Sequence, residues 1–135
     1  MRRKILVIDD ETEVRQAIYR QLAGGGCAVI EACDGEDGIR TLNTGDNPTT
    51  VDAIICDVRM PRINGVEAVA YFRQEYPAIP VIVLTGYPDV RLAEEFMSEG
   101  IVGYLVKPVD KSGLMNAIDK ATGNYAVPSR ANTKM

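Results

Sequence analysis

The sequence predicts an α/β fold with a doubly wound five-stranded parallel sheet, strand order 2-1-3-4-5, and helices on both faces. Two observations lead to this prediction: five short apolar runs recur along the 135 residues, and segments with helical spacing of apolar residues alternate with them. Strands that alternate with helices form a parallel sheet covered on both sides. Right-handed crossovers then leave only a few topologies.

The first strand is predicted over residues 4–8, and acidic residues follow it directly. These acids suit the positive end of a helix dipole, and the apolar residues after them recur at helical spacing as far as Leu22. Glycines 24–26 end this helix. Because they follow a helix and lack the Lys-Ser/Thr pair of a P-loop, they indicate a helix end rather than a phosphate site.

The central part of the chain contains the clearest strand. Residues 27–32 predict a weaker strand, residues 35–42 a short helix, and residues 43–50 a polar loop rich in turn formers. The apolar run 53–56 then stops abruptly at a lone acid, Asp57. A short apolar run closed by a loop signal is typical of a buried strand, so Asp57 lies where that strand leaves the sheet.

The remaining chain repeats the pattern, with helices over 66–76, 90–99 and 110–122 and strands over 80–84 and 102–106. Asp89 and Asp110 stand at helix starts, where a carboxylate caps the first turn. Gly123 ends the last helix, and residues 124–135 are polar with little apolar surface. The sequence therefore predicts one domain over residues 1–123 and a loose C-terminal tail.

Composition excludes several classes of protein. A net charge of −4 argues against a nucleic-acid-binding module, which needs a basic face. No apolar run approaches the length of a membrane span, and no signal peptide is evident. The absence of histidine excludes Ser-His and Cys-His catalysis and histidine-ligated metals. Three irregularly spaced cysteines indicate small apolar residues in a reducing cytoplasm.

Polar residues gather at one predicted edge of the sheet. They stand directly after the apolar runs: Asp9 and Asp10 after the first, Asp57 after the third, Thr85 after the fourth and Lys107 after the fifth. Doubly wound sheets bind ligands at the carboxyl ends of their strands, where the strand order switches. Three close carboxylates repel one another without a cation, and oxygen-only ligands select Mg²⁺. A metal with a hydroxyl and a lysine suits a phosphoryl group.

With these residues the sequence resembles the receiver domain of two-component response regulators, in the CheY-like superfamily with a flavodoxin-like fold. The resemblance covers about residues 4–122. It is carried by the Asp9-Asp10 pair, by DVRMPRINGVE from Asp57, by Thr85-Gly86 and by YLVKP over 104–108.

The resemblance implies a cytoplasmic phosphoprotein of a phosphorelay rather than an enzyme with a separate substrate. Asp57 would accept a phosphoryl group as 4-aspartylphosphate from a histidine kinase or phosphotransfer protein. Asp9, Asp10 and Asp57, with the backbone carbonyl of Arg59, would hold Mg²⁺. Lys107 would pair with a phosphoryl oxygen. The protein would catalyse only its own phosphorylation and autodephosphorylation.

The resemblance also implies a switch. Thr85 would move toward the phosphoryl group, and Tyr104 would turn inward into the vacated space. The Lys107-Pro108 bond would be cis. The output face for a downstream protein would be the helix after Asp89, the strand 102–106 and the helix after Asp110.

The resemblance further implies that Arg59 and Tyr87 set the lifetime of the phosphorylated state. Each lies two residues beyond a site residue, on a loop over the same pocket. Long side chains there can obstruct the path of a water that attacks phosphorus in line.

Three alternatives stay open at this point. A haloacid-dehalogenase-type phosphatase also forms an aspartyl phosphate, but it needs acids two positions apart, whereas Asp9 and Asp10 are adjacent. A phosphate-independent interaction module on the same fold is a second alternative. The third is the front fragment of a longer regulator, with residues 124–135 as a severed linker.

Overall fold

The structure, a computed structural model, describes residues 2–58 and 65–123. Within that part of the chain, five parallel strands form one sheet in the order β2-β1-β3-β4-β5. The strands are β1 (Lys4–Ile8), β2 (Ala28–Ala32), β3 (Ala53–Asp57), β4 (Val81–Thr85) and β5 (Gly103–Val106). The predicted fold class and strand order are confirmed.

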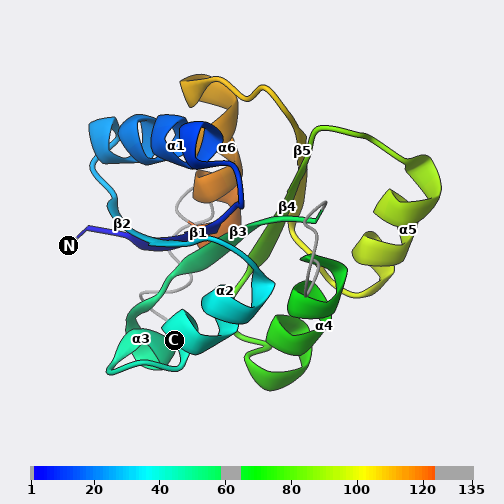
Figure 1. The fold of residues 1–135 in the computed structure, drawn as a ribbon, viewed down its shortest axis with the longest axis horizontal. Coiled ribbons are helices and arrows are strands. Elements are labelled where there is room, and N and C mark those ends of the chain that lie inside the picture. Colours follow the sequence, from blue (N-terminus) through cyan, green and yellow to red (C-terminus); the bar gives the residue numbers. More distant parts are fainter. Residues whose placement is uncertain (1, 59–64, 124–135) are drawn as a thin grey trace.

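Helices cover both faces of the sheet. Those of the described residues are α1 (Thr12–Gly24), α2 (Gly35–Leu42), α3 (Asn47–Thr50), α4 (Gly65–Glu75), α5 (Val90–Ser98) and α6 (Lys111–Thr122). In Figure 1, α1 and α6 lie together on one face of the sheet, and α2 and α4 lie on the other. The helix α5 lies at the β4–β5 end of the molecule. No helix in residues 2–58 and 65–123 has the length and apolar character needed to cross a membrane.

The strands separate two hydrophobic cores because their side chains alternate between faces. In β3, Ile54 and Cys56 pack with the core beneath α2, α4 and α5, whereas Ile55 packs with the core beneath α1 and α6. Every residue of β3 is buried. Phe72 of α4 and Phe96 of α5 anchor the first core. A strand buried on both faces explains why its sequence is continuously apolar.

The region 43–50, which the sequence predicts as a polar loop, contains the single-turn helix α3. Pro48 occupies its first turn, where a missing N–H costs nothing. The N–H groups of Thr49 and Thr50 donate to the carbonyl of Asp46 at 3.0 and 3.1 Å, and Lys4 Nζ donates to Asn47 at 2.7 Å. So short and polar a helix has no apolar periodicity, which is why the sequence pattern missed it.

Two helices begin at a capping aspartate, and one of them ends at a glycine, as the sequence predicts. Asp89 accepts hydrogen bonds from the N–H groups of Arg91 and Leu92 at the start of α5. Asp110 accepts one from Gly113 at the start of α6. Gly123 ends α6 in the left-handed region with φ 77°. The predicted tail, residues 124–135, lies outside the described residues.

The cysteines of the sequence, Cys27, Cys33 and Cys56, are all free thiols. Cys27 and Cys56 are buried, and Cys33 is exposed. Burial raises the pKa of the Cys56 thiol far above its usual value, and the neighbouring Asp57 and Asp9 add to the effect. Cys56 therefore stays a neutral thiol and packs as a small apolar residue.

Candidate functional site

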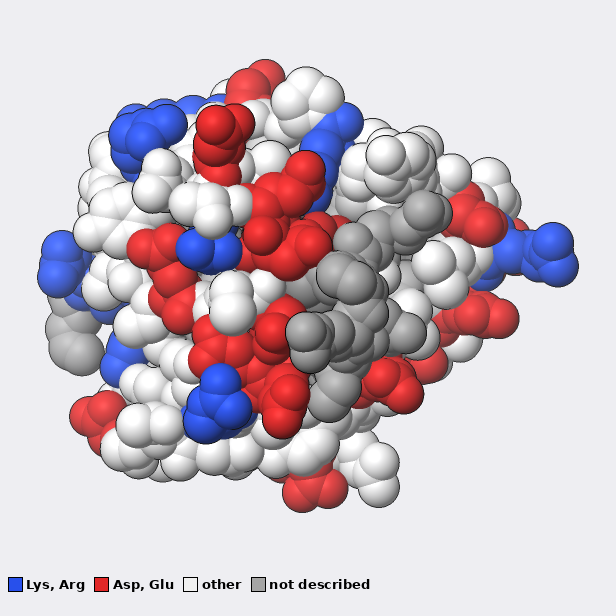
Figure 2. Space-filling model, in the orientation of Figure 1, with Lys and Arg blue, Asp and Glu red and all other residues white. Residues whose placement is uncertain are grey.

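The register of two central strands places the predicted acids side by side. Ile8, the last residue of β1, pairs with Cys56 of β3, the residue before Asp57. Asp9, which follows β1, therefore lies beside Asp57, the last residue of β3, at the edge of the sheet. One carboxylate oxygen from each of Asp9, Asp10 and Asp57 lies within 4.8 Å of the others. Figure 2 shows acidic side chains gathered across the middle of one face of the molecule.

Asp9 is the most constrained member of this cluster. Its side chain is 0% exposed, and its Oδ1 accepts a hydrogen bond from the Glu11 N–H at 2.8 Å. Burial raises the pKa of Asp9 to about 6, and the nearby Asp57 charge acts in the same direction. Its buried Oδ2 forms an ion pair with Lys107 Nζ. An oxygen so placed is suited to a cation.

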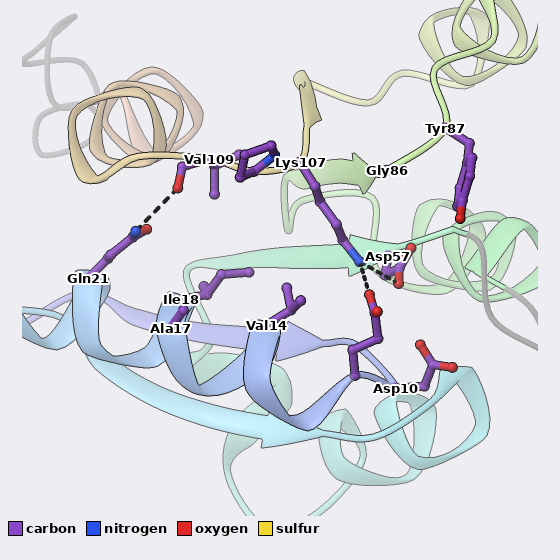
Figure 3. Close-up of a pocket in the computed structure, with 12 residues that line it drawn as sticks. Asp10, Val14, Ala17, Ile18, Gln21, Asp57, Gly86, Tyr87, Lys107 and Val109 are labelled. Atoms are coloured by element: carbon purple, nitrogen blue, oxygen red, sulfur yellow. Dashed lines mark hydrogen bonds and ion pairs between the residues drawn. The ribbon is translucent and has the colours of Figure 1, made fainter.

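Lys107 brings a positive charge to the cluster from the end of β5. Its backbone N–H donates to the Thr85 carbonyl at 2.8 Å, which extends the β4–β5 ladder. Its bond to Pro108 is cis, as the resemblance implies. Figure 3 shows the side chain reaching from this connection to Asp57. Lys107 Nζ lies 3.0 Å from Asp9 Oδ2 and 3.1 Å from Asp57 Oδ2.

A third carboxylate, that of Glu11, also contacts this lysine. Glu11 Oε1 lies 2.9 Å from Lys107 Nζ. Burial by itself lowers the pKa of Lys107, but its hydrogen bonds to Glu11, Asp9 and Asp57 outweigh this and raise the pKa above its usual value. Lys107 is therefore a permanent cation. The sequence pattern indicated Glu11 only as an acid at the start of a helix. Its position directly after Asp9 and Asp10 was the one sequence signal that could have placed it in the site.

The cluster fits Mg²⁺ in its chemistry. Mg²⁺ prefers oxygen ligands and keeps several waters, so a few carboxylates suffice to bind it. Asp9 and Asp57 are buried, while Asp10 is exposed toward water. Asp9, Asp10 and Asp57 are the described residues that would hold the ion. Arg59, whose backbone carbonyl is the other predicted ligand, lies outside the described residues.

The predicted switch residues lie on the neighbouring strands. Thr85 is 1% exposed, and its hydroxyl accepts a hydrogen bond from the Tyr87 N–H at 3.0 Å. The Tyr87 side chain is exposed and forms part of the pocket wall, across from Asp10 in Figure 3. Tyr104 is half-buried, and its hydroxyl accepts from the Asp89 N–H at 3.3 Å. Thr85 and Tyr104 therefore sit on adjacent strands without a hydrogen bond to each other in the part described.

The acid cluster opens into a pocket of about 660 Å³. From Asp57 and Lys107 the pocket continues along α1, past Val14 and Ile18, as far as Gln21 (Figure 3). The Gln21 amide N–H donates to the Val109 carbonyl at 3.2 Å. The pocket thus has a charged end at Asp57 and an apolar wall along α1.

A second, smaller pocket of about 330 Å³ lies between α5 and β5, and its lining includes Tyr104 and Met97. Large apolar side chains are exposed around it, with Val90 77% and Met97 57% exposed. Val106 of β5 is also partly exposed, at 43%. This apolar surface lies on α5 and β5, two of the three elements of the predicted output face.

The fold and the site together define a class of protein: a doubly wound parallel sheet that carries an acidic pocket and a lysine at its switch point. A protein-family profile described as the response regulator receiver domain matches residues 5–119. The chain therefore belongs to the response regulator receiver domain family. Proteins of this family are phosphoacceptor switches rather than conventional enzymes, and phosphorylation and Mg²⁺ binding at the acidic pocket are characteristic of them.

Curated relatives are longer regulators. The transcriptional regulatory protein GlrR of Escherichia coli (strain K12) is 33% identical over 117 residues, which are 87% of this chain and 26% of GlrR. The DNA-binding transcriptional regulator NtrC of Klebsiella pneumoniae is 29% identical over 119 residues, which are 88% of this chain and 24% of NtrC. The chain spans about a quarter of the length of these relatives.

Solved structures agree with the family assignment. A response regulator receiver domain protein from Clostridium thermocellum has a TM-score of 0.84 and 34% identity, and the match covers 93% of this chain and 98% of that one. The chemotaxis protein CheY4 of Vibrio cholerae has a TM-score of 0.81 and 28% identity, covering 90% of this chain and 99% of that one.

Proposed function

We propose that this chain is a receiver that accepts a phosphoryl group on Asp57 and signals through a protein-binding face. The observation that carries the proposal is the position of the Asp57 carboxylate. It is almost fully buried, 3.1 Å from Lys107 Nζ and within the acid cluster. A carboxylate oxygen placed beside a lysine ammonium and a cluster of oxygen ligands is suited to nucleophilic attack on phosphorus.

The transfer forms one bond and breaks another. An oxygen of Asp57 attacks the phosphorus of the donor in line, and the bond from phosphorus to the leaving group breaks. When the donor is a phosphohistidine, the phosphorus–nitrogen bond breaks and the imidazole takes up a proton. The product is an aspartyl phosphate, which water later hydrolyses to the carboxylate and inorganic phosphate.

The residues around Asp57 stabilise charge during this transfer. Lys107 Nζ is positioned to donate to an equatorial phosphoryl oxygen. Asp9 and Asp10 would hold Mg²⁺, which supplies positive charge for the phosphoryl oxygens. The hydroxyl of Thr85 is a further donor on the adjacent strand β4.

The phosphoryl donor is proposed to be a histidine kinase or a phosphotransfer protein. The 135 residues contain no histidine, so a phosphohistidine lies outside them. Receiver domains of the family interact with histidine kinases and with downstream targets. The kinase that serves this chain would be identified by its preferential transfer of phosphate to it.

Mass spectrometry tests the site of phosphorylation. Incubation with acetyl phosphate and Mg²⁺ should add one phosphoryl group, and the chelator EDTA should prevent the addition. Asp57→Asn should lose the adduct, while Asp46→Asn, which changes a carboxylate with a 76% exposed side chain, should retain it. An adduct that persists in Asp57→Asn would disprove the assignment.

The phosphorylated state is proposed to be transmitted through Thr85 and Tyr104 to α5, β5 and α6. The exposed apolar residues and the smaller pocket near Tyr104 support this choice of face for a downstream protein. Chemical shifts on these elements should change on phosphorylation. Thr85→Ala should reduce these shifts and still accept phosphate. Changes confined to α1 and α2 would contradict the proposal.

Arg59 and Tyr87 are proposed to prolong the phosphorylated state by obstructing the attacking water. The support for Tyr87 is its place in the pocket wall. Tyr87→Ala and Arg59→Ala, and above all the double variant, should shorten the half-life of the phosphorylated protein. A tenfold change needs only about 1.4 kcal/mol in the barrier. An unchanged half-life in the double variant would show that neither side chain shields the site.

A second candidate is a receiver that forms the front part of a longer regulator, with residues 1–123 as its domain. The observation that favours it is the length of the curated relatives, of which this chain spans about a quarter. The length of the encoded open reading frame distinguishes it from a single-domain receiver. The same length decides whether the prediction of no direct nucleic-acid contact holds for the whole protein.

A further inference from the structure

Three carboxylates surround the ammonium group of Lys107. Nζ lies 2.9 Å from Glu11 Oε1, 3.0 Å from Asp9 Oδ2 and 3.1 Å from Asp57 Oδ2. A lysine ammonium has three N–H donors. A phosphoryl oxygen on Asp57 that pairs with Lys107 must therefore displace a carboxylate that is already there.

Glu11 is the carboxylate that can leave. The Asp9 side chain is 0% exposed and is held by a hydrogen bond from the Glu11 N–H. Asp57 is 2% exposed and carries the phosphoryl group itself. The Glu11 side chain is 60% exposed, and an exposed ion pair contributes little to stability, so Glu11 can leave Lys107 for water at little energetic cost.

The orientation of Glu11 is not a requirement of helix α1. Glu11 is the residue that precedes α1, and its side chain makes no capping hydrogen bond there. At the equivalent positions of α5 and α6, Asp89 and Asp110 turn their carboxylates onto the N–H groups of the first turn. Glu11 instead directs its longer side chain to Lys107, 96 positions away in the sequence.

We propose that Glu11 is a positioning residue that holds Lys107 in the unphosphorylated protein and releases it to the phosphoryl group. Glu11 thereby competes with phosphoryl ligands at Asp57 and weakens their binding. The inference rests on the proposed function of Asp57, because it concerns the lysine that pairs with the group Asp57 accepts. It extends that function by naming a residue that opposes phosphorylation.

Binding of beryllium trifluoride, a non-reacting mimic of a phosphoryl group, tests the proposal. The dissociation constant would be measured in the presence of Mg²⁺ by isothermal titration calorimetry for the wild type, Glu11→Gln, Glu11→Asp and Glu13→Gln. Glu13 is the matched control, because it is an exposed acid in the first turn of the same helix. Circular dichroism and thermal unfolding would establish that each variant is folded.

Both Glu11 variants should bind beryllium trifluoride about threefold more tightly, as expected for loss of one competing exposed ion pair. Glu13→Gln should bind as the wild type does. Glu11→Asp separates contact from charge: it keeps the negative charge, but its side chain is one methylene shorter and suited to capping α1. Tighter binding in both Glu11 variants therefore supports competition for Lys107.

A spectroscopic signature distinguishes release of Lys107 from a general structural effect. In the wild type, the ¹³C signal of the Glu11 side-chain carboxyl should shift on addition of beryllium trifluoride and Mg²⁺, and that of Glu13 should not. Wild-type binding with no gain in either Glu11 variant overturns the inference and leaves the role of Asp57 intact. A gain in Glu11→Gln alone also overturns it, because charge rather than contact is then responsible. Absence of binding to the wild type overturns both proposals.

Discussion

Replacing Gly38 by alanine should destabilise the fold directly beneath the acid cluster. Gly38 lies in α2 where the helix packs on Ile8, the residue that precedes Asp9. A Cβ at position 38 would lie 2.5 Å from Ile8 Cδ1 and 3.0 Å from Ile8 Cγ1. Carbon atoms in contact are normally separated by about 3.5–4.0 Å. The Ile8 side chain is fully buried and cannot turn into solvent.

The expected magnitude combines two opposing effects. An extra methyl group in a filled core costs about 1–3 kcal/mol. Alanine in place of glycine within a helix contributes about 0.5–1 kcal/mol of stability. The net loss for Gly38→Ala is therefore about 1 kcal/mol, which lowers the midpoint of thermal unfolding by about 3–5 °C in a domain of this size.

Urea unfolding of a small set of variants measures this effect. Gly24→Ala is the matched control, because a Cβ there would meet Lys111 Nζ at an ordinary distance of 3.4 Å. It should be neutral or stabilising. Ile8→Val costs about 0.5–1.5 kcal/mol alone but removes the atom that collides, so the double variant should be more stable than the sum of the single changes predicts. Equal stability of Gly38→Ala and the wild type, or strict additivity, would refute the reasoning.

Three further predictions concern the metal site, the thiols and acid stability. Mg²⁺ should raise the unfolding temperature of the wild type, and Asp10→Asn should lose most of that increase while keeping the Lys107 ion pairs; an equal increase would contradict the assigned ligands. Iodoacetamide should modify Cys33 in the folded protein and Cys56 only after unfolding, as peptide mass mapping would detect; early labelling of Cys56 would contradict its burial. The hydrogen bond from the backbone N–H of Cys33 is the largest cause that lowers the pKa of Asp37, and Arg40 lowers this pKa further. The stabilisation that ionised Asp37 contributes is present above its pKa in the unfolded state and is lost as the pH falls through its lower pKa in the folded state. Asp37→Asn should therefore reduce stability at neutral pH and match the wild type in strong acid. A difference in stability that does not vary with pH would contradict this.

The sequence predicted most of the fold because burial leaves a strong periodic signal. Strand β3 is buried along its whole length, and its continuously apolar run was recognisable. The helix starts at Asp89 and Asp110 were recognisable because a capping carboxylate acts within a few residues of its own position. The single turn α3 was missed because it has no buried face of its own to leave a periodic pattern.

For the site, the sequence alone determined which residues stand at the ends of apolar strands: Asp9, Asp57, Thr85 and Lys107. Topology then required those ends to share one edge of the sheet. The roles proposed for Thr85 and for the other site residues stay predictions until the variants are measured.

Only the tertiary structure decided which of these groups touch. The contact between Glu11 and Lys107 joins residues 96 positions apart and depends on the direction of one exposed side chain. No local pattern specifies that direction, because an acid at the start of a helix has two favourable uses, as a cap or as an ion-pair partner. The strand β1 packs beside β3, and the β5–α6 connection lies above both. Lys107 is therefore within reach of Glu11, and Glu11 forms the ion pair instead of capping α1.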